Sequence, residues 1–286
     1  MLDAASSANP HTIPIPAGWP KGKPMALAVS ILLEGWPPGV APEGGPSTAH
    51  LAKGYDDTAA QSWVSYGPKV GAWRILDVLD AAKAKAVFYV SGILSEQYPE
   101  LLKEIAARGH VLAAHGWAQN ILPIYLEEEQ ECAYQIKIRD SFEALTGQKT
   151  IGYASPRGTP SKHTVELLTQ NGYRWIGDFR DHDLPYLRQT KNGPLVCVPW
   201  SSDINDMPLI VKFGNEPEQM TRAVKRVLSI WKDVPSWPVC QPISAHAHVF
   251  GRPAGALEFL QTLRAIRDSE VAWLTNHAEV AQLYYA

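Results

Sequence analysis

Cysteine is scarce in this chain of 286 residues, which contains Cys132, Cys197 and Cys240 and no Cys-x-x-Cys pair. An odd number of widely spaced cysteines argues against a disulfide framework and against a thiolate zinc site. We therefore expect the three side chains to act as small buried apolar groups.

An excess of charge is also missing, because the net charge is −3 and charged residues make up 19% of the chain. Nucleic-acid binding needs a clustered basic surface, so the expected partner is a small molecule and not nucleic acid. No uncharged apolar run reaches the ~20 residues that span a bilayer. The first residues carry neither the basic cluster nor the apolar segment of a secretory signal. These absences favour a cytoplasmic protein with no membrane partner.

Several common motifs are absent as well. No Gly-x-Gly-x-x-Gly turn follows a predicted strand, and there is no phosphate-binding loop. No serine or cysteine stands in a recognisable nucleophile motif, which makes a covalent mechanism less favoured than direct attack by water.

What the chain does contain is a regular alternation of short apolar runs and helical patterns. The runs are expected to be strands, at residues 26–33, 86–90, 111–114, 151–153, 173–177, 195–198, 242–246 and 271–274. The alternation continues without a break in composition, so it predicts an α/β fold with a single (β/α) barrel over residues 25–286. An open doubly wound sheet is the alternative. Residues 1–24 hold five prolines and are expected to form an extended arm.

Polar residues follow the predicted strands at the ends where a barrel gathers its loops. The first strand runs into Glu34, and the third ends at His115. The later strands lead to Arg157, Asp181, Asp183, Asp203, Asn205, Asp206, His246 and His248. Because the carboxyl ends of parallel strands meet on one rim, these residues are expected to share a site.

Each of these residues also has a structural interpretation. Glu34 and Arg157 can be solvated surface charges, and the segment Asp203–Asp206 can be an ordinary turn. Alternation along the strand points His246 and His248 to the same side, but only one of them is expected to reach a substrate.

The chemistry of the set favours amide hydrolysis. Glu34 and His115 can bind Zn²⁺ or orient a water molecule for attack on a carbonyl group. His246 can protonate a leaving nitrogen or stabilise an oxyanion. Arg157 can hold an anionic or amide group of the substrate by forked hydrogen bonds. The indoles of Trp36, Trp117 and Trp200 are expected to form a flat apolar wall suited to a small planar ring.

The strand-end series resembles the polysaccharide-deacetylase-like superfamily, and more narrowly its branch of allantoinase-type and cyclic-imide hydrolases. Leu33-Glu34-Gly35 stands where that superfamily has Asp-Asp-Gly. His115 matches the first histidine of its second motif, and Gln119 replaces the histidine four residues later. The resemblance implies a distorted seven-stranded barrel.

Further segments resemble the small-molecule branch. They are Tyr66–Arg74, Arg157–Pro160, Asp183–Tyr186, Pro199–Met207, and His246 followed by Gly251-Arg252-Pro253. The resemblance implies that Asp183 and Asn205 help to orient substrate together with Trp36, Trp117 and Arg157. It also implies a homo-oligomer, a tetramer or a dimer.

The departures from the pattern bear on the metal. In the deacetylases the first aspartate acts as base, and the second aspartate and both histidines hold zinc. Leu33 cannot act as a base, and Gln119 offers only a neutral oxygen beside Glu34 and His115. The sequence therefore leaves open whether zinc is bound, and it slightly favours a metal-independent site like that of metal-independent members of the family.

The resulting hypothesis is a hydrolase of the non-peptide C–N bond in a small cyclic imide, ureide or amide, with Glu34, His115 and His246 as catalytic residues. Two alternatives stay open. One is a polysaccharide or peptidoglycan N-deacetylase, and the other is a non-catalytic binding module derived from such a barrel.

Overall fold

The strand β1 (Met25–Leu33) forms the centre of the protein, and every one of its residues is buried. The computed structural model describes residues 19–40, 42, 52, 54–231, 233 and 238–285. A continuous apolar run of this kind is typical of a parallel strand that is covered on both faces. Its register brings Leu32 opposite His246 of one neighbour and Tyr89 of the other.

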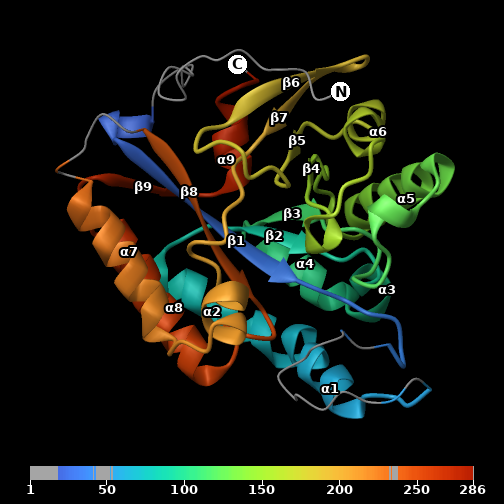
Figure 1. Ribbon diagram of the computed structural model, residues 1–286, viewed down its shortest axis with the longest axis horizontal. Coiled ribbons are helices and arrows are strands. Elements are labelled where there is room, and N and C mark those ends of the chain that lie inside the picture. Colours follow the sequence, from blue (N-terminus) through green and yellow to red (C-terminus); the bar gives the residue numbers. More distant parts are fainter. Residues whose placement is uncertain are drawn as a thin grey trace.

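The described strands form one nine-stranded sheet in the order β6-β7-β5-β4-β3-β2-β1-β8, with β9 also paired to β1 (Figure 1). The parallel strands after β1 are β2 (Val87–Val90), β3 (Val111–Ala114), β4 (Gly152–Tyr153), β5 (Trp175–Ile176), β7 (Gly193–Cys197), β8 (Val239–His246) and β9 (Ala272–Thr275). β6 (Tyr186–Thr190) is antiparallel to β7. The parallel strands therefore end on one edge of the sheet.

Helices connect the strands and pack on the sheet (Figure 1). They are α1 (Thr58–Tyr66), the π-helical turn η3 (Gly67–Gly71), α2 (Ala72–Ala82), α3 (Leu94–Gln97), α4 (Pro99–Ala107), α5 (Glu128–Thr146), α6 (Thr164–Gln170), α7 (Glu218–Ile230), α8 (Pro253–Arg267) and α9 (His277–Gln282). The ends follow local chemistry: Asp57 accepts from the backbone N–H of Ala60 to cap α1, and Gly147 ends α5 in the left-handed region.

Two apolar clusters lie on opposite faces of the sheet. The larger one joins alternate residues of β1, such as Leu27 and Ile31, to α2, α4 and α8. The smaller one lies within the curl of the sheet and contains Leu32, Tyr89 and Trp175. The site begins at Glu34, directly after Leu32 of the smaller cluster and Leu33 of the larger one. Residues on both faces of the sheet therefore pack next to the site.

The α/β class and the barrel-type arrangement expected from the sequence are confirmed. The eight predicted strands all occur, with shifts of a few residues at their ends. The structure adds β6, α1 and α9, which the sequence analysis did not predict. The assignment of 25–286 as one catalytic domain stays a prediction. Residues 1–18 of the expected arm lie outside the described residues.

The three cysteines are free; Cys197 and Cys240 are buried as expected, whereas Cys132 is only half-buried, so the expectation is wrong for it. Within the described part of the chain, no helix combines the length and the apolar character needed to cross a membrane.

Candidate active site

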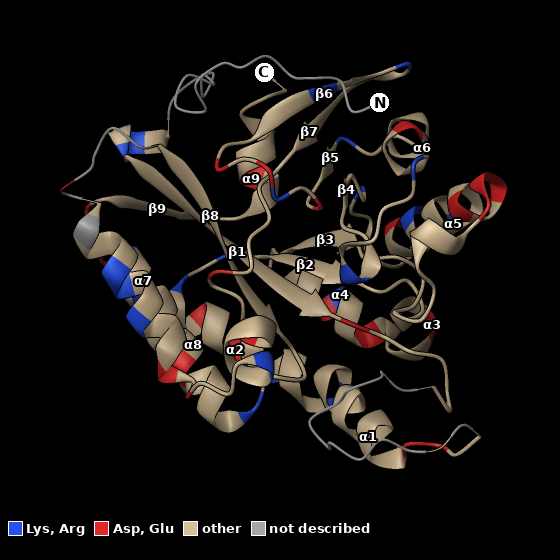
Figure 2. Ribbon diagram, viewed as in Figure 1, with Lys and Arg blue, Asp and Glu red and all other residues tan. Residues whose placement is uncertain are grey.

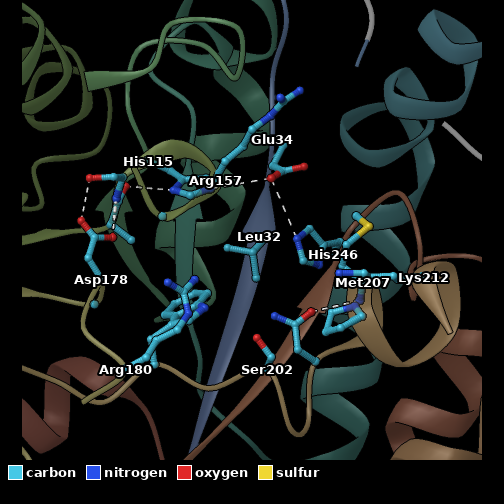
Figure 3. A pocket seen from close by; sticks show the side chains of 17 residues that line it. Leu32, Glu34, His115, Arg157, Asp178, Arg180, Ser202, Met207, Lys212 and His246 are labelled. Carbon is cyan, nitrogen blue, oxygen red and sulfur yellow. Dashed lines mark hydrogen bonds and ion pairs between the residues drawn. The ribbon is translucent and has the colours of Figure 1, made fainter. Parts of the chain in front are cut away.

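Glu34 follows the last residue of β1, and its carboxylate faces the imidazoles of His115 and His246 (Figure 3) and that of His248. Its Oε1 lies 3.7 Å from Nε2 of His115 and 3.9 Å from Nε2 of His246. Its Oε2 lies 3.9 Å from Nε2 of His248. The side chain of Glu34 retains only 13% exposure, so the carboxylate meets these rings in a largely dry environment.

The Glu34 carboxylate is ionised at neutral pH. Burial raises its pKa, but His115 and the charge of His246 outweigh that effect and lower the pKa to about 2. The His248 ring is neutral at this pH, because burial lowers its pKa to about 3. A permanent negative charge therefore lies at the centre of the site.

His115, at the end of β3, has a fixed tautomer. Its Nδ1 lies 2.9 Å from the carbonyl oxygen of Ala154, which can only accept a hydrogen bond. Nδ1 therefore carries a proton, and in the neutral ring Nε2 presents its lone pair toward Glu34. The side chain is 5% exposed, so it is held in place by the protein rather than by solvent.

His246 is held by Asp206, which is fully buried. Oδ1 of Asp206 accepts from Nδ1 of His246 at 2.6 Å, and Oδ2 accepts from the backbone N–H of His246 at 2.7 Å. Burial lowers the pKa of His246, but the negative charges of Asp206 and Glu34 raise it by more than burial lowers it. The pKa of His246 is therefore above its ordinary value. The ring is therefore suited to act as a charged acid.

The position of Asp206 follows from the sheet. After β7 the chain passes along the free edge of β8, where Asn205 forms an isolated parallel bridge with Ser244. The backbone N–H of Ser244 donates to the carbonyl of Ile204 at 2.9 Å. This pairing places Asp206 beside His246 and makes the Asp203–Asp206 segment more than an ordinary turn.

His248 lies beside Glu34 but does not line the cavity. Its side chain is 1% exposed, and its ring meets Trp63 edge-on with 4.5 Å between ring centroids. Of the two histidines after β8, His246 is therefore the one that faces the site.

A cavity of about 250 Å³ opens beside these groups. Glu34, His115 and His246 form one side of it (Figure 3). The other lining residues include Arg157, Asp178, Arg180, Trp200, Asn205, Met207 and Lys212. The cavity thus combines a carboxylate, two imidazoles and several cationic side chains from different strand-end loops.

The loop after β4 is fixed by Asp178, a residue just beyond β5 that the sequence analysis passed over. Its two carboxylate oxygens accept from the backbone N–H and the hydroxyl of Ser155, at 2.7 and 2.6 Å. Burial raises the pKa of Asp178, although these hydrogen bonds oppose the shift. Two residues farther along the loop, Arg157 adopts φ +54°, a left-handed conformation that is costly for a residue with a side chain.

The segment Tyr66–Arg74 holds the loop that follows His246. A Cβ atom at Gly71 would lie 1.9 Å from the carbonyl oxygen of Ala247, so only glycine allows the two backbones to approach. Nη1 of Arg74 donates to Tyr66 Oη and to the carbonyl of Gly251, each at 2.5 Å. This packing gives a structural reason for the segments Tyr66–Arg74 and Gly251-Arg252-Pro253.

The residues predicted to bind substrate are not all brought together. Arg157 and Asn205 line the cavity, whereas Trp36 lines a neighbouring one that shares Glu34. Trp117 is 8% exposed and stacks on Tyr134 instead. Asp183 is exposed and lines a separate hollow with His182 and Ser201. The roles assigned to Trp36, Trp117 and Asp183 therefore have no support from their positions.

The donor set does not fit a zinc site with three protein ligands. Gln119 is buried, and its Nε2 donates to Ser91 Oγ at 3.1 Å and to the carbonyl of His115 at 3.4 Å. Its amide nitrogen is thus used within the protein, and its oxygen would be only a weak neutral ligand beside Glu34 and His115. Among the described residues, no cluster of three or more His, Cys, Asp or Glu side chains is arranged to hold a metal ion. We therefore derive no catalytic step through a metal.

Asp178, Arg180 and Lys212 line the cavity but were not among the predicted site residues. Asp178 had a usable signal, because it follows β5 after a single glycine, Gly177. Lys212 had none, since it lies at the end of a π-helical turn (η6, Met207–Lys212) six residues beyond Asp206.

Comparison with known proteins agrees with this architecture. Residues 55–176 match the polysaccharide deacetylase family. The peptidoglycan deacetylase of Helicobacter pylori is 29% identical over 166 residues, which is 53% of this chain and 55% of that protein. The chain spans between 36% and 55% of the length of the first four curated relatives that it matches.

Two solved structures have the same fold over nearly the whole chain. The allantoinase PuuE superposes with a TM-score of 0.83 at 21% identity, covering 98% of this chain and 94% of its own. A probable polysaccharide deacetylase from Pseudomonas aeruginosa gives a TM-score of 0.82 at 22% identity, covering 95% and 94%.

The family match supports the resemblance to polysaccharide deacetylases over residues 55–176. The enzyme class expected from the sequence, a hydrolase of non-peptide C–N bonds, agrees with that family.

Proposed function

We propose that this protein hydrolyses the non-peptide C–N bond of a small cyclic imide, ureide or related amide without a metal ion. The observation that carries the proposal is the placement of Glu34 Oε1 between two imidazoles with different roles. Nε2 of His115 lies 3.7 Å away on one side, and Nε2 of His246 lies 3.9 Å away on the other.

The first pair is suited to hold the attacking water. When the His115 ring carries a proton on Nδ1 alone, its Nε2 and the Glu34 carboxylate both present acceptor atoms, and two facing acceptors need a donor between them. A water molecule supplies this by donating one hydrogen to each. Held in this way, its oxygen lone pair points away from both groups and toward a carbonyl carbon in the cavity.

The second pair is suited to supply a proton. As water attacks the carbonyl carbon, a C–O bond forms and the water proton passes to Nε2 of His115. The protonated His246, held by Asp206, stabilises the oxyanion and then gives its Nε2 proton to the leaving nitrogen as the C–N bond breaks. The ionised Glu34 stabilises the His115 imidazolium that forms and keeps His246 charged before the reaction.

The size of the cavity supports a small substrate. A volume of about 250 Å³ lies at the lower end of ligand-binding pockets, which suits a single ring with short substituents. Trp200 also lines the cavity and provides an apolar surface. A ring of an imide or ureide presents both the carbonyl and the leaving nitrogen within that space.

A second candidate function is N-deacetylation of a glycan, which the family match and the name of the Helicobacter pylori relative favour. It predicts release of acetate from N-acetylglucosamine oligomers. The replacement of the family's first aspartate by Leu33, which is buried and apolar, counts against it.

The test is turnover of a panel of hydantoins, dihydropyrimidines, succinimides and allantoin by purified protein, with acetate release from chitooligosaccharides measured in parallel. We expect ring opening of at least one panel member and no acetate. Acetate release without ring opening would replace the proposal with the second candidate. Binding of a panel member, measured by thermal stabilisation, without turnover would instead support a non-catalytic module.

A further inference from the structure

The cavity is also lined by cations from three separate loops. Arg157 follows β4, Arg180 follows β5, and Lys212 ends the π-helical turn η6, and all three line the cavity (Figure 3). Each of them is exposed to solvent. None of the three has a carboxylate within 4.0 Å among the described residues, in contrast to Arg108, which contacts Glu104, Asp77 and Asp80.

The loops that carry Arg157 and Arg180 pack against each other. A Cβ atom at Gly158 would lie 2.8 Å from Nη2 of Arg180, so the guanidinium of Arg180 rests against the loop that carries Arg157. Gly158 has φ +62°, and Arg157 itself has φ +54°. Since no hydrogen bond from the Arg157 side chain to another described residue offsets this costly conformation, its position points to a ligand.

The acidic groups of the cavity do not neutralise these cations. Glu34 lies beside the imidazoles, and Asp206 is buried against His246. Asp178 is within electrostatic reach of Arg180, but its oxygens accept from Ser155 and burial raises its pKa. Three cations therefore line the cavity together with the carboxylates of Glu34 and Asp178.

We propose that the substrate carries a carboxylate, which Arg157, Arg180 and Lys212 bind while the scissile C–N bond lies between His115 and His246. This inference rests on the proposed function and names its substrate class as an acidic ureide or imide. Two guanidinium groups suit a planar carboxylate, because each can present a fork of N–H donors to its oxygens. A neutral glycan or a neutral ring would leave the three cations without a counter-charge.

The test uses a matched pair of rings, hydantoin-5-acetic acid and hydantoin-5-acetamide, which differ mainly in charge. We expect kcat/KM to be at least ~10-fold higher for the acid, as for one or more charge-assisted hydrogen bonds. The preference should decline as salt is raised from about 0.05 to 0.5 M, because the cations are solvent-exposed.

Arg180→Gln and Lys212→Gln separate this proposal from a general loss of activity. Each should lower kcat/KM for the acid several-fold, mainly through KM, and leave the amide nearly unchanged. Arg226→Gln is the matched control, because Arg226 is an exposed cation on α7, which carries its basic residues on a separate surface (Figure 2). Equal turnover of acid and amide, or equal losses for both in Arg180→Gln, would overturn the inference and leave the proposed function standing.

If neither hydantoin is opened, binding of the two compounds decides the inference, and the panel of ring compounds decides the proposed function separately. The acid should raise the melting temperature of the wild-type protein more than the amide does, and Arg180→Gln should remove the difference. Equal stabilisation by the two compounds would overturn the inference by this route.

Discussion

Asp206 holds His246 through both of its carboxylate oxygens, one on the ring Nδ1 at 2.6 Å and the other on the backbone N–H at 2.7 Å. The same aspartate therefore fixes the orientation of the ring and keeps its pKa above the ordinary value. Because Glu34 approaches the opposite nitrogen, the proton on Nε2 is held where a leaving nitrogen would need it.

Replacing this aspartate should expose its effect on pH dependence. Because the folded-state pKa of His246 is raised, its acid form, and any stability gained from it, is present at low pH and lost as the pH rises through that pKa. In Asp206→Asn the alkaline limb of the kcat profile should move to lower pH, and kcat should fall by ~10²–10⁴. Asp203→Asn, an exposed neighbour, is the control. An unchanged alkaline limb would show that Asp206 does not set the pKa of His246.

Glu34 should make the stability of the protein dependent on pH in the acidic range. Its pKa is lowered from 4.5 to about 2, so the stability it contributes is present above pH 4.5 and is lost as the pH falls toward 2. Urea unfolding between pH 5 and pH 2 should show a shallower decline for Glu34→Gln than for the wild type. Parallel declines would contradict the lowered pKa.

The close approach of two backbones at Gly71 should matter for activity as well as for folding. Gly71→Ala places a Cβ 1.9 Å from the carbonyl of Ala247 and must displace the loop between His246 and His248. We expect a loss of ~1–3 kcal/mol in the free energy of unfolding, together with a fall in kcat at temperatures where the variant is folded. Gly67→Ala, whose nearest contact is 3.3 Å, should be milder in both measurements.

The metal question can be tested by changing Gln119. Wild-type activity should survive dialysis against a chelator, and the activity should not follow the zinc content of different preparations. Gln119→His supplies a second imidazole beside Glu34 and His115 and should raise zinc binding, as measured by elemental analysis after dialysis. Chelator-sensitive activity that zinc restores in the wild type would contradict the metal-independent mechanism.

The sequence predicted which residues lie at the edge where the parallel strands end. It predicted less well which of their side chains line the cavity. Glu34, His115 and His246 could be found because parallel strands deliver their following residues to one edge. Trp117 could not be placed in this way, because Gly116 has φ +63° and turns the chain after β3, sending the indole toward α5. After such a residue, the alternation of side chains along the strand no longer predicts which way the next side chain points.

The cations of the cavity illustrate the other limit. Arg180 packs against Gly158 of another loop, and Lys212 lies at the end of η6, so no periodicity in the sequence predicts that either residue lines the cavity. β6 was missed for a related reason: its residues are mostly exposed, so it lacks the apolar run that identified the other strands.

The central claim is that His115 and Glu34 prepare water for attack on a C–N bond. Its most direct test is the steady-state kinetics of His115→Ala on whichever ring compound the wild type opens, with the fold checked by circular dichroism and by the melting temperature. The account predicts that kcat falls by at least ~10²-fold, as for loss of a general base, whereas KM changes little. A folded His115→Ala variant that retains full activity would contradict it.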